Sequence, residues 1–330
     1  MKTNLSSQIK LDRIPRRYYH PDDEVELAAL TREEKIYTKI FETIYEGSDY
    51  VASNIVKYIN RYVERSGHCT LALGARMSTH SVYQRLIEMY RAGEVSFNNV
   101  IVFNLSEFFP ISGDGPSTWR RLHEVFLDHI DIDPANVHTF SAEATRENMY
   151  ESCRAYDALI ERCGGIDVTL CEIGPHGCLA FNEPGSMPSS ITRLVLLSNE
   201  MRGKISSDYK TDVAPTTAMT IGLKSILASR RVLCMAWGEN RAELVRQTVE
   251  GPVTSDIPAS LLQTHERTKL AVDLGAAEAL TRISHPWIVT NCDWTDKMIR
   301  RAIVWLCHVT GKPILKLTDK DYNEHGLGEL

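Results

Sequence analysis

Residues 70–105 read TLALGARMSTHSVYQRLIEMYRAGEVSFNNVIVFNL, and this stretch decides the fold class. Two short apolar runs, 70–74 and 99–105, flank a segment at 78–92 in which apolar residues recur at helical spacing. An unbroken apolar run is typical of a strand that is buried on both faces, and a helix between two such strands is typical of a parallel crossover. The stretch therefore predicts a strand–helix–strand unit.

The same alternation continues toward the C-terminus. Further apolar runs occur at 167–173, 192–197, 232–238, 269–274 and 287–292, and helix-patterned segments occur at 117–129, 146–162, 239–251 and 295–310. Short buried strands separated by helices predict a three-layer, Rossmann-like α/β domain with a mostly parallel sheet. Ligands of such sheets bind outside the carboxyl ends of the strands. We therefore expect the site residues in the segments 74–79, 104–108 and 174–184.

The N-terminal region follows a different pattern. Residues 1–30 are polar and aperiodic, and we interpret them as a polar arm. The rest of the chain contains no internal repeat and no linker-like run of Gly, Ser or Pro. We therefore expect residues 31–330 to form a single domain, with 275–330 as an extension packed on it.

A long helix is predicted directly after the arm. Thr31 and Glu34 have the spacing of a helix capping box, and isoleucines recur beyond them at near-helical spacing. This pattern predicts a helix over 31–65, interrupted near Gly47, so that the domain begins with a helical arm.

Composition excludes several classes of protein. The 330 residues are 43% hydrophobic and 24% charged, as in ordinary globular proteins. The net charge of −6 and the lack of a basic stripe lead us to expect no nucleic-acid partner. We also expect no membrane partner and a cytoplasmic location, because the sequence has neither the apolar stretch of a signal peptide nor a run of about 18 apolar residues.

The eight cysteines lie scattered, without a CxxC pair and mostly inside apolar runs. This distribution indicates reduced core residues rather than disulfides or zinc ligands. We accordingly expect no metal and no organic cofactor.

The segment IGPHGCLAFNEPGS (173–186) follows a buried run and is dense in polar and turn-forming residues, which indicates a site. It resembles the G-x-G-x-D-G-H-I-A-F-N-E-P segment of glucosamine-6-phosphate deaminases, and residues 180–184 match that segment one by one. The stretches 90–109 and 127–138 also follow the family pattern, so that the resemblance covers roughly residues 50–270.

The parts outside that range resemble extended members of the family, which form the first half of longer two-domain chains. The resemblance implies a covalently attached C-terminal domain that looks like a deacetylase. It also implies a homo-oligomer, and a fold of the α/β class already predicted from the alternation.

The activity implied by the resemblance is conversion of glucosamine 6-phosphate to fructose 6-phosphate with release of ammonia. This reaction uses a ring-opening histidine supported by carboxylates, an aspartate that moves a proton between two sugar carbons, and a loop that holds the phosphate. In this chain the proton-transfer aspartate falls on Ser106, with the acidic residue beside it kept as Glu107. The aspartate and histidine of the second segment fall on His176 and Cys178, and the supporting glutamate is kept as Glu183.

The phosphate-binding positions are also changed. Where the family reads approximately G-L-x-T-G-x-T-P, this chain reads ALGARMST (72–79), in which Ser78 keeps a hydroxyl and Arg76 adds a cation. Arg193 matches an arginine of the family site. Arg241 falls where the family has a phosphate-binding lysine, which keeps the charge but changes the geometry.

Each of these residues also has a structural interpretation. Glu107 is equally typical of a helix cap, Glu183 of a loop pinned by hydrogen bonds, and His176 of a loop residue without a catalytic role. Cys178 could be a nucleophile activated by His176, but small buried cysteines are commoner. The three arginines are equally compatible with surface charges.

Two functions therefore stay open. The first is an enzyme that acts on an amino-sugar phosphate or a related sugar phosphate with Glu107, His176 and Glu183 in rearranged roles. The second is a catalytically inactive domain that binds a sugar phosphate or serves as a scaffold for a deacetylase-like partner.

Overall fold

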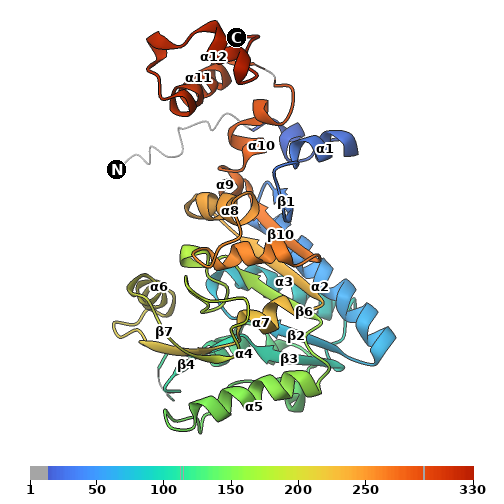
Figure 1. Ribbon diagram of the computed structural model, residues 1–330. Coiled ribbons are helices and arrows are strands. Elements are labelled where there is room, and N and C mark those ends of the chain that lie inside the picture. The colour runs from blue at the N-terminus through green and yellow to red at the C-terminus, as the bar shows by residue number, and fades with distance from the viewer. Residues whose placement is uncertain (1–13, 112, 114, 293) are drawn as a thin grey trace, which may run out of the picture.

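The computed structural model describes residues 14–111, 113, 115–292 and 294–330, and it folds into helix, sheet and helix layers (Figure 1). The central sheet has seven strands in the order β1-β10-β9-β6-β2-β3-β5, and all of its pairs are parallel. Its strands are β1 (Tyr37–Phe41), β2 (Cys69–Leu73), β3 (Val100–Asn104), β5 (Val137–His138), β6 (Val168–Glu172), β9 (Arg231–Ala236) and β10 (Thr268–Asp273). The predicted α/β class with a mostly parallel sheet is thus confirmed.

Helices cover both faces of this sheet. One face carries α2 (Ile44–Ser66), α3 (His80–Arg91) and α4 (Thr118–Val125), and the other carries α5 (Met149–Arg162), α7 (Leu223–Leu227), α8 (Ala242–Val249) and α9 (Leu274–Ala277). Along β2, Leu71 and Leu73 pack in the core between the sheet and the first group of helices, and Ala72 packs in the core on the opposite face. The strands therefore lack polar alternation because both of their faces are buried.

A second, smaller sheet lies beside the first. It consists of β4 (Ser106–Phe109), β8 (Thr217–Thr220) and β7 (Arg193–Leu196), paired antiparallel in that order. Met201 and Ile205 of α6 (Asn199–Tyr209) pack in the same apolar cluster as Phe108. The run at 192–197 is thus a strand, as predicted, but it lies outside the parallel sheet.

The predicted helix over 31–65 is wrong in its first part, and α2 runs without the predicted interruption near Gly47. Thr31 follows the last residue of α1 (Glu24–Leu30) as its C-cap, and β1 precedes α2. Ile36, Thr38 and Ile40 are all buried, so the isoleucines that suggested a helix also satisfy the two-residue period of a strand. Residues 14–30 join the core as well, since Leu30 is buried in it, whereas the first thirteen residues of the predicted arm lie outside the described residues.

The C-terminal part forms a small unit with its own core. It contains α11 (Asp296–Thr310) and α12 (Asp319–Glu324), at the top of Figure 1, and α10 (Thr281–Ser284), whose Ile283 is buried in the core of the main sheet, connects it to the rest of the chain. The predicted strand at 287–292 is wrong, because Pro286 opens a turn of 3₁₀-helix that carries Trp287 into a cluster with Ala302, Leu306 and Leu327. None of the helices in the described part of the chain is long and apolar enough to cross a membrane.

A buried ion pair joins this unit to the first strand of the sheet. Arg282 Nε of α10 lies 2.8 Å from Glu34 Oε1, and the two side chains are only 1% and 3% exposed. Arg282 Nη2 also donates to the carbonyl oxygen of Thr38, at 2.9 Å. Burial raises the pKa of Glu34 to about 7, and the nearby Arg282 offsets part of this effect.

This raised pKa makes the stability of the fold depend on pH. Because the folded chain binds the Glu34 proton more tightly than the unfolded chain, this stabilisation is complete below pH 4.5 and is lost as the pH rises to about 7. We expect the free energy of unfolding of the wild type, measured relative to Glu34→Gln by urea denaturation, to fall by about 3 kcal/mol over this range. A difference between the two proteins that does not change with pH would contradict the assignment.

Candidate functional site

A cavity of about 150 Å³ opens at the carboxyl ends of β2, β6 and β9. The parallel sheet brings the segments that follow these strands to the same edge, and α6 closes the cavity from the side of the small sheet. The charged and polar side chains in its lining are Arg76, Ser78, Glu172, Lys204, Asp208, Asn240 and Arg241. Three of the sequence-predicted residues, Arg76, Ser78 and Arg241, are thus brought together.

The central contact of the cavity is an ion pair between Arg76 and Glu172. Arg76 Nε lies 2.5 Å from Glu172 Oε1, and the side chains are 16% and 15% exposed. The guanidinium also lies 5.9 Å from the ring centre of Phe181. Burial raises the pKa of the Glu172 carboxyl, and the cations Arg76 and Arg241 counteract this effect.

Sequence reasoning missed Glu172, although the family segment contains the signal. Glu172 stands at the first glycine of G-x-G-x-D-G-H, and Arg76 stands at the second glycine of G-L-x-T-G-x-T-P. Two positions that have no side chain in the family pattern therefore carry opposite charges here, and these charges contact each other.

The other groups of the cavity leave it with one excess positive charge. Lys204 of α6 pairs with Asp208, so that three cations (Arg76, Lys204, Arg241) face two carboxylates (Glu172, Asp208). Ser78 Oγ is buried and has no hydrogen-bond partner among the described residues. The cavity thus offers cationic groups and an unsatisfied hydroxyl.

Glu107 does not line the cavity, because its carboxylate caps α4. It accepts hydrogen bonds from the backbone nitrogens of Thr118 and Trp119, at 3.0 and 2.8 Å, and from Ser117 Oγ at 2.8 Å. The residue is 2% exposed, so that its oxygens satisfy the free N–H groups at the start of a helix in a water-poor setting. This is the structural arrangement that the sequence left open as an alternative to catalysis.

Ser106 and Cys178 are both buried and lie outside the cavity lining. Ser106 is in β4, opposite Thr220 of β8. Cys178 is fully buried beside Arg76, and burial raises the pKa of its thiol to about 12. A thiol in such surroundings stays protonated and unreactive near neutral pH.

His176 lies on the outside of the same loop. Its backbone is left-handed, with a φ of 52°, and its half-exposed ring pairs with the exposed carboxylate of Glu200. Both His176 and Cys178 are described, and no hydrogen bond joins their side chains. The structure thus separates the two groups that a thiol nucleophile would need.

Glu183 and Arg193 hold a loop together. The Glu183 carboxylate accepts from the backbone nitrogen of Ser198 at the start of α6, at 3.1 Å. Arg193 donates to Asn182 Oδ1 at 2.8 Å and to Ser186 Oγ at 2.9 Å. Neither side chain lines the cavity.

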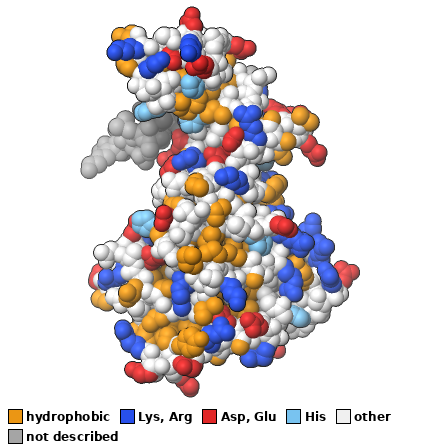
Figure 2. Space-filling model, in the orientation of Figure 1, with side chains coloured by type: hydrophobic (Ala, Val, Ile, Leu, Met, Phe, Trp, Pro, Cys, Tyr) orange, Lys and Arg blue, Asp and Glu red, His pale blue; other side chains and the backbone are white. Residues whose placement is uncertain are grey.

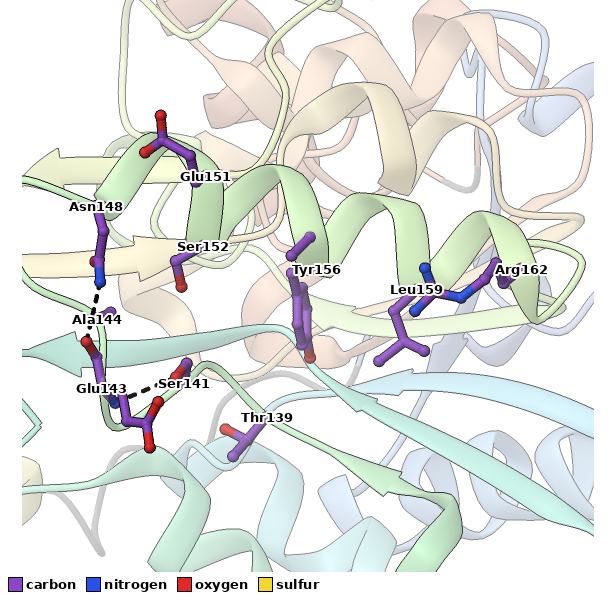
Figure 3. Close-up of a pocket in the computed structure, with 11 residues that line it drawn as sticks. Thr139, Ser141, Glu143, Ala144, Asn148, Glu151, Ser152, Tyr156, Leu159 and Arg162 are labelled. Carbon is purple, nitrogen blue, oxygen red and sulfur yellow. Dashed lines mark hydrogen bonds between the residues drawn. The ribbon is translucent and has the colours of Figure 1, made fainter.

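A larger pocket, of about 490 Å³, lies against α5 and contains none of the predicted site residues (Figure 3). Some of its polar groups form hydrogen bonds within the protein. Asn148 Nδ2 donates to the carbonyl of Glu143, and Ser141 Oγ accepts from the Glu143 nitrogen. Tyr156 donates to the carbonyl oxygen of Asn104 at 2.9 Å. Because none of the residues matched to the family site lines it, this pocket is the weaker candidate. No group of three His, Cys, Asp or Glu side chains that could hold a metal occurs in the described part of the chain.

The capping role of Glu107 can be tested by its effect on stability. We expect Glu107→Ala to lower the free energy of unfolding by about 3 kcal/mol, because it removes a cap and leaves several buried donors without an acceptor. Glu124→Ala, on the exposed face of the same helix, should change stability by less than about 0.5 kcal/mol. Chemical denaturation of both variants measures the difference, and equal stabilities would show that Glu107 is not a structural cap.

Comparisons with known proteins identify the family. The model of the family described as glucosamine-6-phosphate isomerases/6-phosphogluconolactonase matches residues 45–271. A putative glucosamine-6-phosphate deaminase-like protein of Bacteroides thetaiotaomicron is 48% identical over 332 residues, which cover all of this chain and 50% of that protein. The chain therefore spans about half the length of this relative. A glucosamine-6-phosphate deaminase of Thermoanaerobacter sp. is 33% identical over 245 residues, which cover 73% of this chain and 95% of that protein.

Solved structures agree with this result. A monomeric glucosamine-6-phosphate deaminase superposes with a TM-score of 0.69 at 29% identity, covering 74% of this chain and all of that one. A 6-phosphogluconolactonase from Trypanosoma brucei, at 19% identity, covers 75% of this chain and 99% of that one with a TM-score of 0.60, and shows the shared fold alone. The extent of the family match and the identity to these relatives show that the chain belongs to the glucosamine-6-phosphate isomerase/6-phosphogluconolactonase family.

Proposed function

We propose that this chain binds a sugar phosphate in the cavity between β2, β6 and β9 and does not deaminate it. One observation carries the proposal: Arg76, Ser78 and Arg241 converge on this cavity, whereas Ser106, Glu107, His176, Cys178 and Glu183 do not line it. The anion-binding part of the family site is retained in altered form, and the groups that would move protons are directed elsewhere.

The charges of the cavity favour a phosphate group. Guanidinium groups bind phosphate oxygens through charge-assisted hydrogen bonds, and Arg241 and Arg76 supply two of them. Ser78 Oγ would gain the partner that it lacks among the described residues. The excess positive charge of the cavity is reduced when the anion binds.

Proton transfer in the family reaction needs a base within about 3 Å of the sugar carbon that loses its proton. The carboxylates that line the cavity are Glu172 and Asp208, and both are paired with cations. Both carboxylates are therefore engaged in ion pairs with groups of the protein. This arrangement supports binding over turnover.

The wider setting of the chain belongs to the same proposal. All eight cysteines are free, in keeping with a reducing, cytoplasmic location. The relative of twice the length supports an attached second domain, which we propose to be deacetylase-like and to receive or sense the bound sugar phosphate. We further propose that the protein forms a homo-oligomer.

Ligand binding and ammonia release separate the two functions. Calorimetry should detect glucosamine 6-phosphate binding to the wild type, and Arg241→Ala should weaken it about tenfold or more through loss of a charge-assisted contact. Arg91→Ala, on the exposed end of α3, should bind like the wild type. No ammonia should be released by any of these proteins. Ammonia release above background would overturn the proposal in favour of an altered enzyme. A wild type that binds no sugar phosphate would refute both the binding function and the enzymatic one.

The Arg76–Glu172 pair gives a second test. Because Glu172 competes with the ligand for the Arg76 guanidinium, Glu172→Gln should bind inorganic phosphate about tenfold more tightly than the wild type. Arg76→Gln should bind it more weakly, and thermal denaturation should show that both variants are folded. Equal affinity of the wild type and Glu172→Gln would mean that Arg76 does not contact the anion.

A further inference from the structure

Another pocket, of about 580 Å³, lies in the C-terminal unit between the end of α10 and one face of α11. The α11 side chains that line it are spaced three and four residues apart from Lys297 to His308, so they form one stripe along the helix. The opposite face of α11 carries Ala302 and Leu306 into the core of the unit. The family match ends at residue 271, so this pocket lies outside the family domain.

The wall of this pocket is cationic. Lys297, Arg300 and Arg301 line it, and none of the described residues in its lining is acidic. Neither arginine forms an ion pair with a described carboxylate, whereas Arg85, Arg230 and Arg246 elsewhere in the chain do. Figure 2 shows Lys and Arg side chains beside apolar ones on this unit, at the top of the view. Two arginines without a described carboxylate partner, on a chain of net charge −6, favour an anionic ligand.

The pocket also contains flat rings that are held in place. Trp305 lies 6.1 Å from His285 and 6.0 Å from both Trp287 and His325, between ring centres. His285 is fixed by Ser284 Oγ, which lies 2.6 Å from its Nδ1. An indole and an imidazole that are packed in this way offer a rigid surface for stacking a planar ring.

We propose that this pocket binds a mononucleotide, whose phosphate is held by Arg300 and Arg301 and whose base packs on Trp305. The volume lies within the range of small-molecule sites, roughly 300–1,000 Å³. Arginine forks suit phosphate oxygens, and the neighbouring rings distinguish this pocket from a site for a bare anion. The inference is independent of the proposed sugar-phosphate function, because it uses residues of another part of the fold.

The test is calorimetric titration of the full chain with AMP, adenosine and inorganic phosphate. AMP should bind more tightly than either fragment. Arg300→Gln/Arg301→Gln should weaken AMP binding about 30-fold or more, through the loss of two charge-assisted contacts. Trp305→Leu should weaken the binding of AMP but not that of inorganic phosphate.

Two controls make the outcome specific. Lys316→Gln/Lys320→Gln removes the same charge from exposed positions of the same unit and should leave AMP affinity within about twofold, since long-range charge effects are screened. Arg241→Ala should also leave AMP binding unchanged, which separates this pocket from the sugar-phosphate cavity. Circular dichroism should show that all variants are folded at the temperature of the titration. No saturable AMP binding, equal affinity for AMP and inorganic phosphate, tighter binding of an acidic peptide than of AMP, or AMP affinity unchanged in Arg300→Gln/Arg301→Gln would overturn the proposal.

Discussion

The ion pair between Arg76 and Glu172 determines what the carboxyl edge of the sheet can do. Both side chains are mostly buried, and burying a charge without a partner costs several kcal/mol. Each residue therefore stabilises the other, and replacing one of them alone lowers the stability of the fold. The pair lies at the carboxyl ends of β2 and β6, the edge at which α/β sheets bind their ligands. Any anion that binds there must therefore share Arg76 with the carboxylate of Glu172.

The other departures from the family pattern fit around this pair. Cys178 lies next to Arg76, and a side chain added at Gly174 would lie 2.4 Å from the Cys178 sulfur and 3.5 Å from Arg76 Nη1. The space is therefore full. An imidazole at position 178, as in the family segment, is larger than a thiol and would meet the guanidinium. The small thiol of Cys178 and the added guanidinium of Arg76 therefore fit together in a space that an imidazole at position 178 would fill.

The sequence predicted the features that follow from burial and missed those that follow from tertiary contacts. Strands such as β2 and β6 are apolar on both faces, so their patterns were clear. The segment around Ile36 and Ile40 was misread because four residues satisfy both a helical turn and two strand repeats. The separate sheet that holds Ser106 could not be predicted, since pairing between β4 and β8 joins residues more than a hundred positions apart.

The same distinction applies to the site. Arg76, Ser78 and Arg241 follow parallel strands, so topology alone brings them to one edge, and the sequence was sufficient to nominate them. The sequence could not decide whether Glu107 was a base or a cap, because both roles place a carboxylate between a strand and a helix. Glu172 was missed because its partner is distant in the chain.

The C-terminal part of the chain also contacts the edge of the central sheet. β1 is an edge strand, and an exposed parallel edge presents unpaired backbone groups that promote association with other chains. Here Arg282 of α10 donates to the Thr38 carbonyl of that strand, and Glu34 neutralises the arginine in a buried setting. Residues on both sides of the family domain therefore meet at one edge. The contacts of Arg282 with Glu34 and with the Thr38 carbonyl thus attach the C-terminal part of the chain to the sheet and satisfy one backbone group of its edge strand.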